Sequence, residues 1–447
     1  MDYQTVTAAV AACAGLTRTL RPISSTLSDR RGGRREREGR GKHMMGAGLR
    51  RLWLTTAVGG IGLSLYAGWL TADDFRDRAS SERDIAAACD HLVSGAQVMD
   101  LQGGMVRARA EDYDDYRLDA RHLPSACTIY RVSGARSTGL FRLIAESSGH
   151  SDPVNMIGQS SPFFTRSSSY PENVTAAADR EPEAWPLGDG TLGSYTNFRT
   201  TIRAQCGSGS AKAAPRLLHV TAVGRYEDVS AGDRRRLARL AYSATQQLTQ
   251  RIGCRTRLAD LPEQMPAVPT KLRPVASATG SCRWAGPLAK EDGPGRLPDR
   301  ALPIPARDAN PMEGCLLAVG PARVRAIAGG LDADQRAWAD GALDYAPWWL
   351  RTVSYFGADA ASVGYEATSG DVRLKPGTAG GENGMWWASS TCNGQPALHT
   401  LTVDHLYDDV LGHQALSSLF RAYVDDITTR RGCTHVTYPP ARNFRDL

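Results

Sequence analysis

Two stretches of the sequence decide the fold: LLHVTAVGRYEDV, from Leu217 to Val229, and ALHTLTVDHLYDDV, from Ala397 to Val410. In each, apolar residues alternate with polar ones, which is typical of a β-strand with one buried face. The likeness predicts that the chain holds two copies of one folding unit. The matched positions are Leu218-His219 with Leu398-His399, and Tyr226-Glu227-Asp228-Val229 with Tyr407-Asp408-Asp409-Val410.

An amphipathic helix is predicted directly after each stretch. In both copies the apolar residues fall 17, 14, 13, 10 and 6 positions before a cysteine. This helical spacing, shared over a whole helix, supports the duplication. Each helix is expected to end at a Gly-Cys pair, where glycine favours a helix C-terminus. The apolar positions are Leu237, Leu240, Ala241, Ala244 and Leu248 before Cys254, and Leu416, Leu419, Phe420, Tyr423 and Ile427 before Cys433.

Cysteines repeat with the same arrangement. Of nine in the chain, Cys13 stands alone and eight form two sets of four, with gaps of 38, 79 and 48 residues and then 33, 77 and 41. Even numbers of spaced cysteines in an exported chain are typical of disulfides, because that compartment is oxidising. The predicted disulfide cysteines are Cys89, Cys127, Cys206 and Cys254, then Cys282, Cys315, Cys392 and Cys433.

Chain geometry favours one pairing of the three possible in each set. The extended stretch from Ala397 to Tyr407 covers about 36 Å at ~3.3 Å per residue. The helix from Gly412 to Gly432 returns about 31 Å at ~1.5 Å per residue, which brings the flanking cysteines within disulfide reach. We therefore predict Cys206–Cys254 and Cys392–Cys433 and, by elimination, Cys89–Cys127 and Cys282–Cys315.

The predicted fold is α+β: two tandem homologous disulfide-bonded modules, at 80–258 and 278–440, each with antiparallel strands and a C-terminal amphipathic helix. A linker at 259–277 joins them, in a proline-rich region without sustained periodicity. Within the modules, 147–186 is predicted to be loop, and 333–365 a helix followed by a strand.

Residues 52–72 carry no charge and are flanked by Arg50-Arg51 and Asp73-Asp74. Their length matches one hydrocarbon core, so we predict a single transmembrane helix, with residues 1–51 a basic, disordered cytoplasmic arm and the rest extracytoplasmic. A buried soluble helix and a cleaved signal peptide are the alternatives, although no A-x-A cleavage pair occurs here. Translation from Met44 or Met45 would remove most of the arm.

Composition excludes some classes of function. The net charge is +6, but nine Lys or Arg lie between Arg30 and Arg51, so the remainder is near neutral. The balance predicts no nucleic-acid partner. No phosphate loop, G-x-S-x-G elbow, H-E-x-x-H helix or C-x-x-C pair occurs. We therefore predict no cofactor and assign no catalytic residue, although scattered residues can also assemble a site.

Several polar and aromatic residues are candidates for a functional site. Imidazoles and carboxylates cluster near residues 399–413 and could bind a divalent metal, but ordinary polarity at a strand end is favoured, and no metal site is predicted. His219 and His399 lie within apolar strands and are interpreted as structural. The Tyr-acid-acid-Val turn serves the fold, and Trp386-Trp387 is interpreted as core packing rather than a ligand surface. The metal candidates are His399, Asp404, His405, Asp408, Asp409 and His413.

The Ala-, Arg- and Gly-heavy composition, the basic tail, the single apolar segment and the paired-cysteine modules resemble uncharacterised cell-envelope proteins of actinobacteria. The resemblance covers the layout of the chain and implies no activity or site residue. Three functional hypotheses follow: a non-catalytic envelope protein that binds an extracytoplasmic protein or small ligand, an extracytoplasmic enzyme with a site in or between the modules, and a sensor acting through the basic arm.

Overall fold

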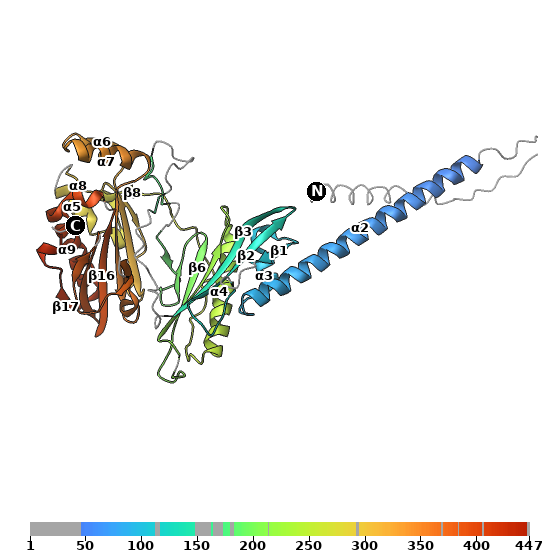
Figure 1. The fold of residues 1–447 in the computed structure, drawn as a ribbon, viewed down its shortest axis with the longest axis horizontal. Coiled ribbons are helices and arrows are strands. Elements are labelled where there is room, and N and C mark those ends of the chain that lie inside the picture. The colour runs from blue at the N-terminus through green and yellow to red at the C-terminus, as the bar shows by residue number, and fades with distance from the viewer. Residues whose placement is uncertain are drawn as a thin grey trace, which may run out of the picture. The chain divides into compact units, whose positions relative to one another are not determined.

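A computed structural model describes residues 46–111, 117–147, 162–163, 173–178, 183–212, 214–291, 295–367, 370–382, 384–404 and 406–444. The chain divides into two compact units, Met1–Gly68 and Trp69–Leu447, and both large sheets belong to the second unit (Figure 1). We keep the names first module and second module for residues 80–258 and 278–440.

The first module contains a seven-stranded antiparallel sheet in the order β1-β2-β3-β7-β6-β5-β4. Helix α2 (Gly46–Ala88) leads into it, α3 (Gly95–Met99) follows, and α4 (Ala231–Arg251) comes after the last strand. The strands are β1 (Ala108–Ala110), β2 (Ser125–Ser133), β3 (Arg136–Ser147), β4 (Trp185–Pro186), β5 (Gly193–Tyr195), β6 (Arg199–Gln205) and β7 (Leu217–Gly224).

The second sheet has eight strands, in the order β14-β15-β16-β11-β10-β9-β8 with β17 paired to β15 outside that order. Strand β8 (Arg273–Pro274) lies in the linker. The second module holds the other strands, which are β9 (Arg300–Pro303), β10 (Met312–Ala318), β11 (Trp349–Phe356), β14 (Gly380–Glu382), β15 (Met385–Cys392), β16 (Gln395–Val403) and β17 (Cys433–Thr437), besides the hairpin β12 (Gly364–Ala367) and β13 (Gly370–Arg373). Its helices are α5 (Ala285–Glu291), α6 (Pro321–Ala328), α7 (Ala333–Asp344), α8 (Tyr407–Leu411) and α9 (His413–Arg431), with short 3-10 turns that include η5 (Asp359–Ser362).

The two sheets have corresponding strand orders. Read from β1 in the first sheet and from β9 in the second, β1-β2-β3-β7-β6-β5 corresponds to β9-β10-β11-β16-β15-β14. In each, the last long strand lies in the middle of the sheet and the helix that follows it covers one face. The fold is therefore α+β, with two antiparallel sheets and segregated helices.

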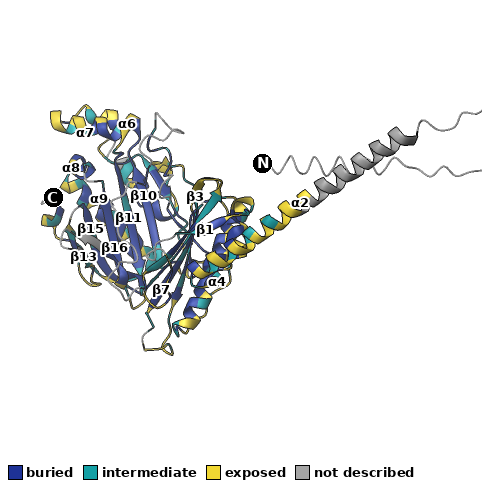
Figure 2. Cartoon of the chain, turned by 45° about the vertical axis from the view of Figure 1, so that its right-hand side comes forward, coloured by how far each residue is buried: buried dark blue, intermediate teal, exposed yellow. Residues whose placement is uncertain are grey.

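Helices α4 and α9 form the main cover of the two cores. All ten apolar positions picked out by their spacing are buried. Figure 2 shows α4 with both buried and exposed residues along its length, as expected for an amphipathic helix. Both helices end at the predicted glycines: Gly253 has a φ of 68°, and Gly432 is the left-handed cap of α9. A side chain at either position would be strained, because left-handed backbone disfavours a Cβ atom.

The disulfide prediction is confirmed. The structure forms the four predicted pairs: Cys89–Cys127, Cys206–Cys254, Cys282–Cys315 and Cys392–Cys433. Every bridge stays within one module. In each module one bridge ties a cysteine near the start of the module to a strand, and the other ties a cysteine at a strand end to one just after the covering helix.

The transmembrane prediction at 52–72 is wrong. Within the described part of the chain, no helix combines the length and the apolar character needed to cross a bilayer. The stretch holds four glycines and three threonines, which dilute its hydropathy, and α2 continues from it into the charged segment Asp73–Arg78. Of the predicted arm at 1–51, residues 1–45 lie outside the described residues.

The two modules are joined at a seam built from loop segments. Residues 173–178 pair with the linker, where Ala177 bridges Lys271, and Ala178 joins an apolar cluster with Leu316 and Trp349 of the second sheet. In return, the linker buries Met265 and Val268 in the first core. The first module therefore covers apolar surface of the second sheet, and the linker covers apolar surface of the first core.

Candidate functional site

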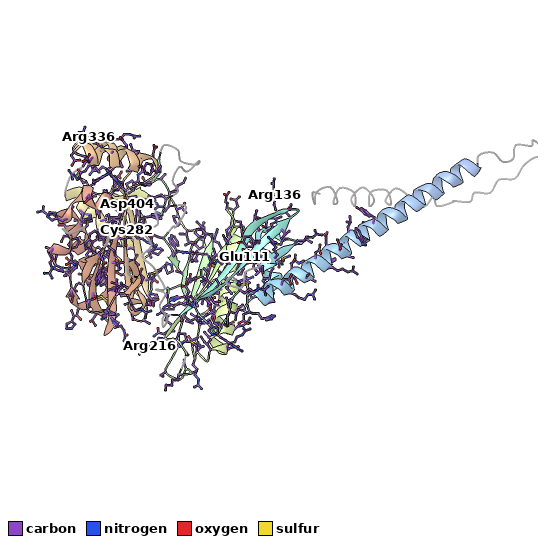
Figure 3. The ribbon with its side chains drawn as sticks, in the orientation of Figure 1. Glu111, Arg136, Arg216, Cys282, Arg336 and Asp404 are labelled. Carbon is purple, nitrogen blue, oxygen red and sulfur yellow. A yellow bond between two sulfur atoms is a disulfide. The ribbon has the colours of Figure 1, made fainter. Side chains whose placement is uncertain are left out.

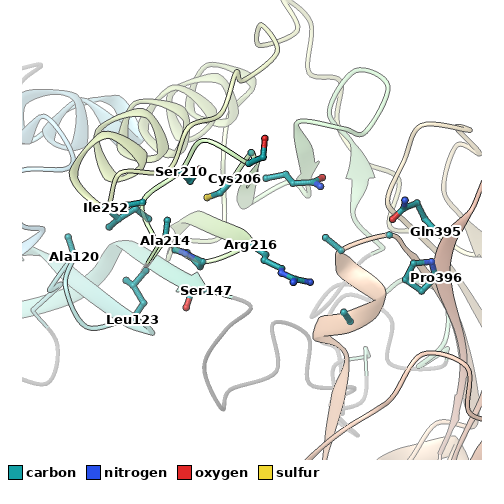
Figure 4. Close-up of a pocket in the computed structure, with 18 of the residues that line it drawn as sticks. Ala120, Leu123, Ser147, Cys206, Ser210, Ala214, Arg216, Ile252, Gln395 and Pro396 are labelled. Carbon is teal, nitrogen blue, oxygen red and sulfur yellow. The ribbon is translucent and has the colours of Figure 1, made fainter.

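A cleft of about 960 Å³ opens along the seam, lined by both modules. Its first wall is the loop after β6, from Cys206 to Arg216; its second carries Gln395 and Pro396 at the start of β16. Figure 4 shows Arg216 reaching into the space toward this second wall. The volume is typical of a ligand-binding site.

Arginine dominates the charge of the cleft. Arg121 and Arg216 come from the first module and Arg373 from the end of β13. The described residues that line the cleft include no aspartate, glutamate, histidine or aromatic residue. Asp119, close in sequence to Arg121, is engaged by His122 at 2.7 Å, and this hydrogen bond, with the backbone N–H of Arg121, lowers the pKa of Asp119. The cleft is therefore suited to an anion, since guanidinium groups bind carboxylate or phosphate in two-point geometry.

The loop that forms the first wall is held in place. The Cys206–Cys254 bridge fixes its start to the end of α4. Ser210 Oγ accepts a hydrogen bond of 2.8 Å from the backbone N–H of Arg255, and the Gly207 N–H donates to the Arg255 carbonyl at 2.8 Å. A ligand would therefore meet a wall that needs little ordering on binding.

A second polar group, deeper in the seam, joins the modules directly. Arg203 of β6 contacts Asp359 of the second module at 2.6 Å, and His219 Nε2 lies 3.4 Å from the other oxygen of the same carboxylate. Burial opposes ionisation of Asp359, but the hydrogen bond from His219 and the charge of Arg203 outweigh it, so the pKa of Asp359 is lowered. The group is a buried ion cluster between modules.

His219 and Asp359 also line a cavity of about 240 Å³. A histidine held by an aspartate is an arrangement used for proton transfer. Here, however, the remaining ring nitrogen, Nδ1, is covered by protein and has no hydrogen-bond partner within the described structure. A substrate could not reach it without a movement of the surrounding side chains, so the cluster acts first as a tie between the modules.

His399 has a different environment, entirely inside the second module. It is fully buried under α9, where Ser354 Oγ lies 2.7 Å from Nδ1 and Ser390 Oγ lies 2.8 Å from Nε2. Tyr423 extends this hydrogen-bonded network, with its hydroxyl 2.5 Å from Ser354 Oγ. Burial lowers the pKa of His399 to about 3. The ring is therefore neutral and structural.

The register of the two sheets shows that these histidines are not equivalent. We call three residues that pair side by side on neighbouring strands a rung. In each module one rung begins at the cysteine of the second strand in the shared order, which is β2 in the first sheet and β10 in the second. Counting from these rungs gives the structural match between the modules. The rungs are Cys127, Leu143 and Ala222 in the first sheet, and Cys315, Thr352 and Leu401 in the second.

By this count Val220 corresponds to His399, and His219 corresponds to Leu398. Leu218 and Val220 point into the core under α4, so His219 points to the opposite face. The match of Leu218-His219 with Leu398-His399 is thus displaced by one residue. Such a displacement turns every side chain to the other face of a strand.

The candidate metal cluster is not assembled. His399 is in the buried network, Asp404 lies at the strand end (Figure 3), Asp408 is buried in α8, and His413 is exposed. His405 lies outside the described residues. Nowhere in the described ranges do three His, Cys, Asp or Glu side chains come together as a metal site would require.

Trp386 packs in the core, as interpreted from sequence. Its ring stacks on Phe444 with centroids 5.3 Å apart, and its indole N–H donates to the Asn443 carbonyl at 2.8 Å. Trp387 is partly buried beside a smaller apolar cluster. Neither residue lines the cleft.

The arginines of the cleft were not predicted. They are far apart in sequence, and no local pattern marks them. Comparison of the chain with known families, characterised proteins and solved structures finds no match.

Proposed function

We propose that the chain is a non-catalytic binding protein of an oxidising, extracytoplasmic compartment, and that it binds an anionic ligand in the cleft between its modules. The observation that carries the proposal is the cleft lining: three arginines from separate segments and, among the described residues, no carboxylate. At Arg121 and Arg216 a bound anion would gain charge-assisted hydrogen bonds, and no described acidic residue lines the cleft to compete with it.

The lining also favours binding over catalysis. Its hydroxyl groups belong to serines such as Ser208 and Ser210, and no described imidazole or carboxylate lines the cleft to activate them. The sulfur atom of Cys206 is held in a disulfide with Cys254. The residues present are therefore those of recognition.

The extracytoplasmic assignment rests on the four disulfides, all of which join residues within a module. Reducing compartments keep thiols reduced, so such a set is typical of export. Alkylation of the native protein before reduction, followed by peptide mapping, tests this. We expect the eight cysteines after residue 88 to be protected, and free thiols at these positions would contradict the assignment.

Ligand binding is tested by thermal unfolding of the full oxidised chain with inorganic phosphate, citrate, glucose and spermidine. Phosphate and citrate should raise the midpoint temperature of unfolding if they occupy the cleft, since a ligand of the native state stabilises it. Glucose, which is neutral, and spermidine, which is a polycation, should leave the midpoint temperature unchanged. Arg216→Gln should remove the effect, while Arg239→Gln, the same change on the exposed face of α4, should leave it.

Equal stabilisation of both variants would show that the anions act on the protein as a whole, and the cleft proposal would fail.

A further inference from the structure

A second cavity, of about 450 Å³, lies beside the cleft. The two cavities share Gln205, Cys206 and Gly207, so the loop after β6 borders both. We name this second space the side cavity. It is lined by residues that precede β5 and by the segment that follows α4, both from the first module.

The side cavity repeats the charge of the cleft. Arg203, Arg255 and Arg257 line it, and no acidic or aromatic residue does so within the described structure. Arg203 is engaged by Asp359, whereas Arg255 and Arg257 are exposed and form no ion pair with a described residue. Arg121 and Arg216 in the cleft are likewise exposed and form no ion pair with a described residue. Four guanidinium groups are thus available along the two spaces.

The position of Arg255 connects them. A Cβ atom built on Gly209 would lie 3.0 Å from Arg255 Nη1, so this guanidinium rests against the loop that separates the cavities. Ser210, which lines the cleft, is bonded to the backbone of the same arginine. Positive charge therefore continues from the cleft, past the loop, into the side cavity.

We infer that the cleft and the side cavity form one groove for a linear polyanion, a chain with repeated phosphate or carboxylate groups. This inference rests on the proposed function and specifies its ligand. A single small anion would contact the arginines of one cavity only, whereas a chain can contact both. Absence of aromatic residues from the described lining opposes nucleic acid, whose bases are held by stacking on aromatic rings.

Calorimetric titration of the full oxidised chain with inorganic phosphate, tripolyphosphate, long-chain polyphosphate and poly-glutamate tests the inference. Affinity per chain should rise with chain length, because each added anionic group reaches another guanidinium. The polyphosphate and poly-glutamate arms distinguish phosphate from carboxylate chains. A single-stranded oligonucleotide is included, and binding tighter than that of polyphosphate would overturn the inference in favour of a nucleic-acid site.

Variants separate the two cavities. Arg257→Gln should weaken long-chain polyanions about tenfold and leave inorganic phosphate unchanged, since one charge-assisted hydrogen bond is lost in the side cavity alone. Arg216→Gln should weaken both. Arg239→Gln is the matched control and should weaken neither. Unchanged thermal midpoints without ligand establish that each variant folds.

Two results would overturn the inference. If Arg216→Gln weakens every anion while Arg257→Gln weakens none, and length has no effect, the cleft binds small anions and the proposed function stands alone. If all three variants weaken polyanions equally, the attraction is diffuse surface charge, and the proposed function fails with the groove.

Discussion

His219 and His399 stand at matching places in the sequence and on opposite faces of their sheets. His399 lies under α9, fully buried, with a hydroxyl group at each ring nitrogen. His219 faces the seam and shares Asp359 with an arginine. A displacement of one residue in strand register therefore separates a core position, that of His399, from an inter-module position, that of His219. Four predictions test this contrast, from the largest expected effect to the smallest.

The largest effect concerns acid and His399. Its pKa is about 3 in the folded chain against 6.5 in the unfolded chain, so acid favours the unfolded state. The contribution of His399 to the free energy of unfolding is fully present above pH 6.5 and is lost as the pH falls toward 3. At about 1.4 kcal/mol per pH unit, the full loss is on the order of 5 kcal/mol. Urea unfolding at stepped pH measures it.

His399→Val, which places the residue of the corresponding position in the first module, should flatten that decline between pH 6 and 4. A slope that persists in the variant would assign the acid response to other groups. Asp359 is separable, because its lowered pKa makes its contribution disappear only below its ordinary value of 3.8.

The next effect concerns the seam. Asp359→Ala leaves Arg203 and His219 buried without their shared partner, and removal of one member of a buried ion pair costs about 3 kcal/mol. Because the pair joins the modules, we also expect two unfolding transitions where the parent chain shows one. Fluorescence and circular dichroism curves that remain coincident in the variant would contradict the role of this cluster as a tie.

A smaller loss is expected within the His399 network. Ser390→Ala removes the hydroxyl at Nε2 and should lower the free energy of unfolding by about 1 kcal/mol, the typical value of one hydrogen bond. Ser389→Ala is the neighbouring control for the loss of one hydroxyl, because Ser389 Oγ donates to the Thr378 carbonyl rather than to His399. If the network interpretation is right, the pH dependence of the free energy of unfolding changes in the Ser390 variant and stays the same in the Ser389 variant.

The smallest effect is expected from His219→Gln. An amide can still donate to Asp359, and Arg203 remains, so the loss should stay below about 1 kcal/mol. Chemical denaturation provides the measurement. A loss as large as that of Asp359→Ala would mean that the histidine, rather than the arginine, supplies most of the attraction across the seam.

The fold was predictable where local patterns carry it. Helical spacing placed Leu237 and Leu416 in the two cores, and the cysteine pairs followed from matched strand and helix lengths. The transmembrane helix was predicted wrongly because an uncharged stretch is not the same as a sufficiently apolar one.

The histidine match failed because it used an offset that the helices do not share. Matching Leu218-His219 with Leu398-His399 needs an offset of 180 residues, whereas the rung residues Ala222 and Leu401 are 179 apart, as are Cys254 and Cys433. The cleft could not be predicted at all: Arg121, Arg216 and Arg373 meet only through tertiary structure.

The exchange of loop segments at the seam has a consequence for biosynthesis. Ala178 of the first module packs on Leu316 and Trp349, which leave the ribosome well after it. Likewise, the core around α4 lacks Met265 and Val268 until the linker has been made. The fold of the N-terminal half therefore stays incomplete during translation. A fragment that ends near residue 258 should expose apolar surface and should need a chaperone, or the rest of the chain, to remain unaggregated.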